Sequence, residues 1–222
     1  EADSLYQAIQ STKISNPQTD CICPIGEELI LKGLHQVVPG EFYAAATRPP
    51  AVYRGNPFQI EVGLAYGAQA PTQSVTEELL EGLIAMKDVN VAEGQTMEVL
   101  RYANCVPLQF QHGACAITQT VMGTNWRSYG LSQSRGSLPK GPVTAMVHVA
   151  SVWVPFTSES KEAIASYPEI QKELRLGLQA VGRKLGMYLR RRLRVKQEGD
   201  RRATFLRYLG EVARAVGVSV AS

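Results

Sequence analysis

The stretch 58-FQIEVGLAY-66 decides the fold. Its large apolar residues occupy every second position, and smaller or polar residues lie between them. The apolar set is Phe58, Ile60, Val62, Leu64 and Tyr66. Alternation with a period of two over this length is typical of a β-strand with one buried face. This stretch therefore predicts a sheet that packs against other elements on one side.

Segments on either side of this strand predict the remaining elements. We expect further strands at 42–47, 97–105 and 143–156, and helices at 3–12, 27–34 and 114–122. Residues 71–95 are ambiguous, because a helix-like run at 77–86 is interrupted by Gly82.

The last quarter of the chain is helical in pattern. Apolar residues recur at spacings of three and four, at Tyr167, Ile170, Leu174, Leu178, Val181, Leu185 and Tyr188. We expect a helix over 161–196, about 54 Å long, then a break at Gly199-Asp200 and a second amphipathic helix. Such a helix is longer than a domain of this size, so its far end is expected to contact another body. Together the elements predict an α+β fold, a two-layer mixed sheet with helices on one face followed by a long C-terminal helix.

Composition excludes several classes of protein. The chain has 222 residues, 45% hydrophobic and 19% charged, which is ordinary for a globular domain and argues against disorder. The longest apolar stretch, 143–156, is too short and too polar to span a membrane. The four cysteines show no zinc-binding spacing, so we expect reduced thiols in the cytoplasm and no metal site. They are Cys21, Cys23, Cys105 and Cys115.

Charge is distributed unevenly along the chain. The formal net charge is +3, but residues 172–214 hold 13 Lys or Arg against 4 Asp or Glu, a local net charge of +9. A basic end on an acidic body indicates an anionic partner. The alternative is a well-solvated helix surface, which composition alone favours.

Lys161 is the first candidate site residue. It lies in the run TSESKEAI at the expected start of the long helix, where a cation opposes the helix dipole. An anion at that position would remove the cost, because free N–H groups, hydroxyls and an ammonium together form a phosphate site. The alternative is a solvated lysine screened by Glu159 and Glu162.

The second candidate site is 125-NWRSYG-130. Trp126 and Tyr129 could contact a nucleic acid while the Arg127 guanidinium binds phosphate. The two aromatic residues could equally anchor the loop to the core. Arg135 and Lys140 nearby favour a polyanion. No complete catalytic site is evident, and His148, within an apolar strand, is interpreted as a hydrogen-bonded core residue.

These residues also carry a resemblance to a known family. Nearly the whole chain, from about residue 3 into the basic helix, resembles the B subunit of DNA topoisomerase VI, the ATP-driven subunit of type IIB topoisomerases. The resemblance rests on TRPPAVYRGNPFQIEVGLAYG (47–67), RYANCVPLQFQHGACAIT (101–118), NWRSYGLSQ (125–133), HVASVWVPFTSESKEAI (148–164) and EIQKELRLGLQAVGRKLGMYLRRR (169–192).

The resemblance implies a domain arrangement. Residues 1–19 resemble the end of a helix-two-turns-helix insert with its linker. Residues 20–160 resemble the transducer domain, a unit like ribosomal protein S5, and 161–222 a stalk helix with a short C-terminal helix. The N-terminal ATP-binding domain has no counterpart here, and the chain begins with Glu1. We therefore expect a piece of a longer protein that binds no ATP by itself.

The resemblance also implies roles for the candidate residues. A transducer lysine of the family contacts the γ-phosphate of ATP, and Lys161 stands at that position. A Trp-Lys-x-Tyr motif of the family contacts DNA, and here it reads Trp126-Arg127-Ser128-Tyr129. The implied cofactors are ATP and Mg²⁺ in the intact assembly.

The implied partners are DNA, the DNA-cleaving A subunit and a second B subunit, in a cytoplasmic, nucleoid-associated enzyme. The chain would then couple ATP hydrolysis to DNA double-strand passage. Cys105 and Ala68 depart from the family pattern. Two alternatives remain open: a non-enzymatic nucleic-acid-binding module, in which Lys161 is incidental, and an assembly adaptor that acts through the long helix.

Overall fold

The computed structural model describes residues 2–12, 17–67, 95–215 and 217. The ambiguous run 77–86 and the departure at Ala68 lie outside the described residues. Within the described ranges, no helix is both long enough and apolar enough to cross a membrane.

The sheet is mixed, as predicted. Its strand order is β1-β3-β6-β4-β5, and β2 pairs with β3. Only the β4–β6 pair is parallel among the pairings that join the named strands. The strands are β1 (Phe42–Thr47), β2 (Ala51–Tyr53), β3 (Asn56–Tyr66), β4 (Glu98–Ala103), β5 (Val106–Pro107) and β6 (Val143–Ser151). The short strands β2 and β5 were not predicted, and β6 ends five residues before the expected position.

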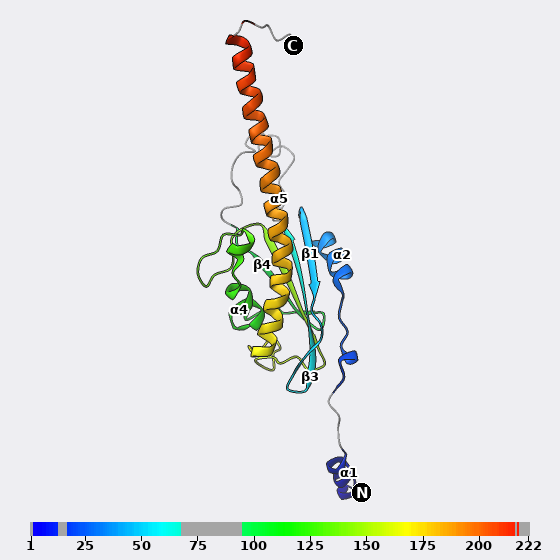
Figure 1. The fold of residues 1–222 in the computed structure, drawn as a ribbon. Coiled ribbons are helices and arrows are strands. Elements are labelled where there is room, and N and C mark those ends of the chain that lie inside the picture. The colour runs from blue at the N-terminus through cyan, green and yellow to red at the C-terminus, as the bar shows by residue number, and fades with distance from the viewer. Residues whose placement is uncertain (1, 13–16, 68–94, 216, 218–222) are drawn as a thin grey trace, which may run out of the picture.

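The described helices are α1 (Ala2–Ser11), α2 (Glu27–Val37), α4 (Ala116–Gly123) and α5 (Pro168–Ala215), with short 3-10 turns η1 (Thr19–Cys21), η2 (His112–Ala114) and η3 (Trp126–Tyr129). Figure 1 shows α4 and α5 on the same side of the sheet and α1 well away from it. α1 has no buried residue.

The main core lies between the sheet and α4 and α5. Ile60, Val62 and Leu64 of β3 are fully buried there. They pack in one cluster with the predicted apolar face of α5, which is buried at Ile170, Leu174, Leu178, Val181 and Leu185. Gly177 allows a close approach, because a Cβ at this position would lie 2.8 Å from Cγ2 of Val62. The two-layer prediction is confirmed for this side of the sheet.

The opposite face of the sheet is also covered, in contrast to the prediction of helices on one face only. Ile30 and Leu34 of α2 form a second buried cluster there with Ala45 and Ala65. Strand β3 is consequently buried on both faces, and its polar positions lie in the interior. The alternation at 58–66 therefore predicted the strand correctly but not the burial of its second face.

The C-terminal helix differs from the prediction in two ways. It begins at Pro168 rather than at residue 161, and it continues without a break through Gly199 and Asp200 to Ala215. The predicted second helix was wrong, because one glycine in a helix interior costs only about 1 kcal/mol. The 48 residues of α5 extend about 72 Å. Figure 1 shows the far half rising beyond the sheet, where residues 190–209 are exposed throughout.

Candidate functional site

The loop that carries Lys161 is fixed at its base and exposed at its tip. Phe156 pairs with Ile164 in an antiparallel bridge, and the N–H of Thr157 donates to the carbonyl of Ala163 at 2.9 Å. Ala163 and Ile164 are fully buried. The N–H of Ala116, at the start of α4, donates to the carbonyl of Ile164 at 2.9 Å. The base of the loop is thus part of the core, whereas the residues of the tip project from it.

Lys161 lies at this tip with an exposed side chain. Its N–H donates to the carbonyl of Ser158 at 3.2 Å. Among the ion pairs of the described residues, none involves its ammonium. Its φ of 56° lies in the left-handed region, which costs a residue with a side chain about 1–3 kcal/mol. A strained, exposed and unpaired lysine on an anchored loop is suited to bind an anion that arrives from outside the chain.

The helix-start argument for Lys161 is wrong. α5 begins seven residues later, at Pro168, so the helix dipole does not act on this ammonium. The neighbouring hydroxyls do not cap a helix either, because Ser158 and Ser160 hydrogen-bond each other at 2.7 Å. The position of Lys161 is therefore set by the conformation of the loop and not by a helix terminus.

Trp126 anchors the second candidate site. Its side chain is fully buried, and its Nε1–H donates to the carbonyl of Val121 at 2.8 Å. Its backbone N–H donates to Oε1 of Gln133 at 3.1 Å. With no exposed surface, the indole has none to offer to DNA in this conformation. The structure favours the anchoring interpretation for this residue.

Tyr129 fixes the same loop to α5. It is half-buried, and its ring meets that of Trp126 edge-on, with centroids 6.1 Å apart. A Cβ on Gly182 would lie 2.6 Å from Cε2 of Tyr129, and one on Gly186 would lie 3.4 Å from its Cα. The two glycines of α5 thus let the helix lie directly against the loop.

Arg127 is the member of the motif that stays available. Its side chain is exposed, and its Nε–H donates to the carbonyl of Gln133 at 2.6 Å. Among the described residues this is the single hydrogen bond of the guanidinium. Because an arginine has five N–H donors, the outer edge of the group is free to bind an anion.

The two candidate sites do not form one centre. The Lys161 loop is attached at the first residue of α4 through Ala116, whereas η3, which carries Trp126 and Tyr129, follows the last residue of α4, Gly123. They therefore lie at opposite ends of this helix.

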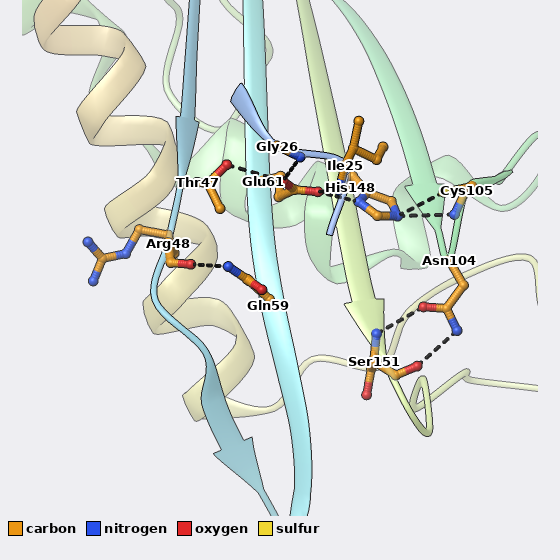
Figure 2. A network of polar contacts seen from close by, with 10 residues as sticks. All are labelled: Ile25, Gly26, Thr47, Arg48, Gln59, Glu61, Asn104, Cys105, His148 and Ser151. Atoms are coloured by element: carbon orange, nitrogen blue, oxygen red, sulfur yellow. Dashed lines mark hydrogen bonds and ion pairs between the residues drawn. The ribbon is translucent and has the colours of Figure 1, made fainter. Parts of the chain in front are cut away.

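A buried polar network was not predicted (Figure 2). The Glu61 carboxylate, within β3, is fully buried and accepts four hydrogen bonds. The donors are the N–H groups of Ile25 at 2.8 Å and Gly26 at 2.7 Å, the hydroxyl of Thr47 at 3.1 Å and Nδ1 of His148 at 2.9 Å. The sequence carried two separate signals for it, the carboxylate of Glu61 and the imidazole of His148, each in the middle of an apolar strand.

The hydrogen bonds of His148 define its tautomer. Its Nε2 lies 3.0 Å from the backbone N–H of Cys105 and accepts from it. The other nitrogen must then carry the proton that it donates to Glu61. Burial raises the pKa of Glu61, but the hydrogen bonds from His148, Ile25, Gly26 and Thr47 outweigh it and hold this pKa below the ordinary value of 4.5. The interpretation of His148 as a hydrogen-bonded core residue is confirmed.

Further hydrogen bonds join the β4–β5 turn to the end of β6. The Asn104 side chain accepts from the N–H of Ser151 and donates to its carbonyl, both at 2.9 Å. Asn104 and Cys105 form the β4–β5 turn, with φ of 45° and 66°. Two left-handed residues are what a two-residue hairpin turn requires. Cys105 thus occupies a position that favours glycine, and its N–H contributes to the network.

Comparison with known proteins gives these sites a context. The family described as "Topoisomerase VI B subunit, transducer" matches residues 17–201. The chain belongs to this family. The resemblance seen in the sequence is thereby confirmed, and the matching region extends from the linker before η1 well into α5.

Individual topoisomerase VI B subunits agree with this result. The chain is 42% identical over 213 residues to the B subunit of type 2 DNA topoisomerase 6 from Methanococcoides burtonii, covering 96% of the chain and 31% of that protein. It is 44% identical over 194 residues to the corresponding protein from Archaeoglobus fulgidus, covering 87% of the chain and 29% of that protein. The chain therefore spans about a third of the length of these relatives.

Among solved structures, the chain is similar to the B-subunit of the DNA gyrase from Myxococcus xanthus. The likeness has a TM-score of 0.38 and 19% identity, and covers 70% of this chain and 38% of that one.

Proposed function

We propose that this chain is the transducer part of an ATP-dependent type IIB DNA topoisomerase. It couples ATP binding and hydrolysis to the passage of one DNA duplex through a double-strand break made by the A subunit. One observation carries the proposal: in a chain of the transducer family, an exposed lysine without an ion pair stands at the tip of a loop anchored in the core.

Lys161 is the residue that we assign to the nucleotide. Its ammonium contacts the γ-phosphate of an ATP held by another domain of the intact protein. The exposed position fits this role, because the phosphate need not enter the transducer. ATP with Mg²⁺ supplies the phosphoryl group whose loss on hydrolysis would remove the contact. An anchored base would make the loop transmit that change to the core rather than absorb it.

Helix α5 is the element that carries the movement further. It starts at Pro168, four residues after the buried Ile164 of the loop base. Its first half is held to the sheet by the buried apolar face and by the ion pair between Arg48 and Glu173 at 2.9 Å. Its far half is basic and exposed. We propose that this half meets the A subunit and the DNA near it, while nucleotide binding pairs two B subunits. The assembly would work in the cytoplasm, on nucleoid DNA.

DNA contact is assigned to the exposed part of the second site. Arg127 binds the duplex backbone, while Trp126 and Tyr129 hold the loop rigidly against α5. Arginine replaces lysine in the motif, and its planar donors suit phosphate. Because Tyr129 packs on Gly182, DNA bound at this loop would be mechanically connected to the helix.

A relaxation assay tests the proposal. In the intact protein, together with the A subunit, we expect Lys161→Ala to abolish ATP-dependent relaxation of supercoiled DNA, and Lys161→Arg to retain part of it. Lys32→Ala, on the opposite face of the sheet, is the matched control and should relax DNA normally. Normal relaxation by Lys161→Ala would overturn the assignment and favour the simpler nucleic-acid-binding module.

A further inference from the structure

A hollow of about 310 Å³ lies beside the second candidate site. It is lined by the end of α4, by Arg127, and by the turn that contains Ser134, Arg135 and Gly136. Two arginines thus belong to one hollow, and no aspartate or glutamate is among its lining residues. Asn125 and Ser134 add neutral hydrogen-bonding groups.

The wall of the hollow is held in place by Gln133, which is buried. Its side-chain nitrogen donates to the carbonyls of Met122 and Ser137, both at 3.0 Å. Its oxygen accepts from the N–H of Trp126, and its backbone carbonyl accepts from Arg127. One residue therefore joins both sides of the hollow, and the hollow is formed before any ligand arrives.

Arg135 is presented by a tight turn. The N–H of Ser137 donates to the carbonyl of Ser134 at 3.2 Å, and Gly136 has a φ of 71°. A positive φ at the third residue of a turn is what glycine supplies without strain. Arg135 is exposed, and no hydrogen bond or ion pair of its guanidinium occurs within the described part of the chain.

The lining supplies two guanidinium groups and no carboxylate, so an anion in this hollow would meet positive charge without a competing negative group. Planar guanidinium groups match the oxygens of a phosphate in pairs. We infer that this hollow binds one phosphodiester group of a DNA duplex, and that Arg135 is a second phosphate-binding residue in addition to Arg127. The inference rests on the DNA contact proposed above and adds to it the shape of the site and a residue outside the motif.

Salt-dependent binding of a short labelled duplex to this chain tests the inference. Arg135→Ala should weaken binding about three- to tenfold at moderate salt. The double variant Arg127→Ala/Arg135→Ala should lower the slope of log K against log salt by about one unit, because both residues serve the same phosphate. Lys32→Ala on α2 removes the same charge elsewhere and should leave the slope unchanged.

Several results would overturn the inference. A slope reduced by about two units would mean two separate phosphates rather than one hollow, and unchanged binding by Arg135→Ala would mean no contact. Because Arg135 has no hydrogen bond to lose among the described residues, this variant is expected to fold normally. Inorganic phosphate, followed by the amide signals of Arg135 and Gly136, should also bind. Phosphate binding without any effect of Arg135→Ala on duplex binding would reject DNA as the source.

The test is independent of ATP coupling. If Lys161→Ala relaxes DNA normally but Arg135→Ala still weakens duplex binding, phosphate binding by the hollow is supported and the coupling proposal is rejected. If relaxation depends on Lys161 but duplex binding is unaffected by Arg135→Ala, the coupling proposal is supported and the phosphate-binding hollow is rejected.

Discussion

The Lys161 loop and the Trp126–Tyr129 turn look alike in sequence but differ in structure. Both are short polar connections next to apolar segments. In the first, the buried residues form the base, and the candidate side chain of Lys161 is at the exposed tip. In the second, the aromatic residues are themselves the anchor, and the arginine between them is exposed. Residues that hold a loop in place are thus distinct from the residues that the loop presents, and motif membership does not separate them.

The largest expected effect is on stability, from Trp126. Replacing it with alanine removes a fully buried side chain and should lower the free energy of unfolding by about 3–5 kcal/mol. Trp153→Ala is the matched control, because this tryptophan is 72% exposed. It should change the free energy by no more than about 0.5 kcal/mol. Urea denaturation of both variants measures the difference, and equal effects would contradict the anchoring role.

The buried carboxylate of Glu61 gives the next effect. Glu61→Gln should cost about 1–3 kcal/mol at neutral pH, because an amide cannot accept from all the donors that surround this position. Since its pKa is lowered in the folded state, Glu61 contributes stability that is fully present above pH 4.5 and is lost as the pH falls below that value.

The free energy of unfolding measured as a function of pH tests this. The wild type should lose more stability below pH 4.5 than the Glu61→Gln variant does. Identical curves would show that the hydrogen bonds to Glu61 do not lower its pKa.

Gly182→Ala probes the contact between the Tyr129 turn and α5. The added Cβ would lie 2.6 Å from the Tyr129 ring, so the turn must shift at a cost of about 1–3 kcal/mol. The higher helix propensity of alanine offsets about 1 kcal/mol of this cost. Gly199→Ala, where a Cβ meets nothing within 4 Å, should stabilise the chain by about 1 kcal/mol. If both variants gained stability equally in thermal unfolding, the turn would not be held by the helix.

The smallest stability effect is expected for Lys161, and it separates the fold of the loop most clearly from its proposed function. Lys161→Gly should stabilise the chain by about 1 kcal/mol, because glycine adopts a φ of 56° without strain. The same variant of the intact protein should lose ATP-dependent relaxation. Thermal unfolding should therefore show a higher stability for this variant, whereas the relaxation assay should show a lower activity. A loss of stability would show that the left-handed conformation is not strained.

Sequence patterns predicted the parts of the fold that depend on local periodicity. The alternation at 58–66 gave β3, and the spacing from Ile170 to Leu185 gave the buried face of α5. The cover of the second sheet face was not predictable from β3, because Gly63 and Glu61 are buried by α2 and by residues 25 and 26. The start of α5 was placed too early because a polar, serine-rich run resembles a helix cap.

For the candidate sites, too, the sequence indicated residues but not their tertiary contacts. Lys161 and Arg127 were selected as candidates from the sequence, and both are exposed in the structure. The helix-dipole reason for Lys161 was wrong, because α5 begins at Pro168. The burial of Trp126 depends on packing against α4 and Gln133, contacts that the order of residues in the motif does not encode. The hollow with Arg135 required the position of the turn after Gln133.

The most direct test of the account compares ATP with ADP. In the intact protein, Lys161→Ala should weaken the affinity for ATP by roughly 10- to 150-fold, the value of a charge-assisted hydrogen bond of about 1.5–3 kcal/mol. The affinity for ADP, which lacks the γ-phosphate, should not change. Isothermal titration of both nucleotides against the wild type and the variant gives the answer, and an equal loss for ATP and ADP, or no loss for either, would contradict the γ-phosphate contact.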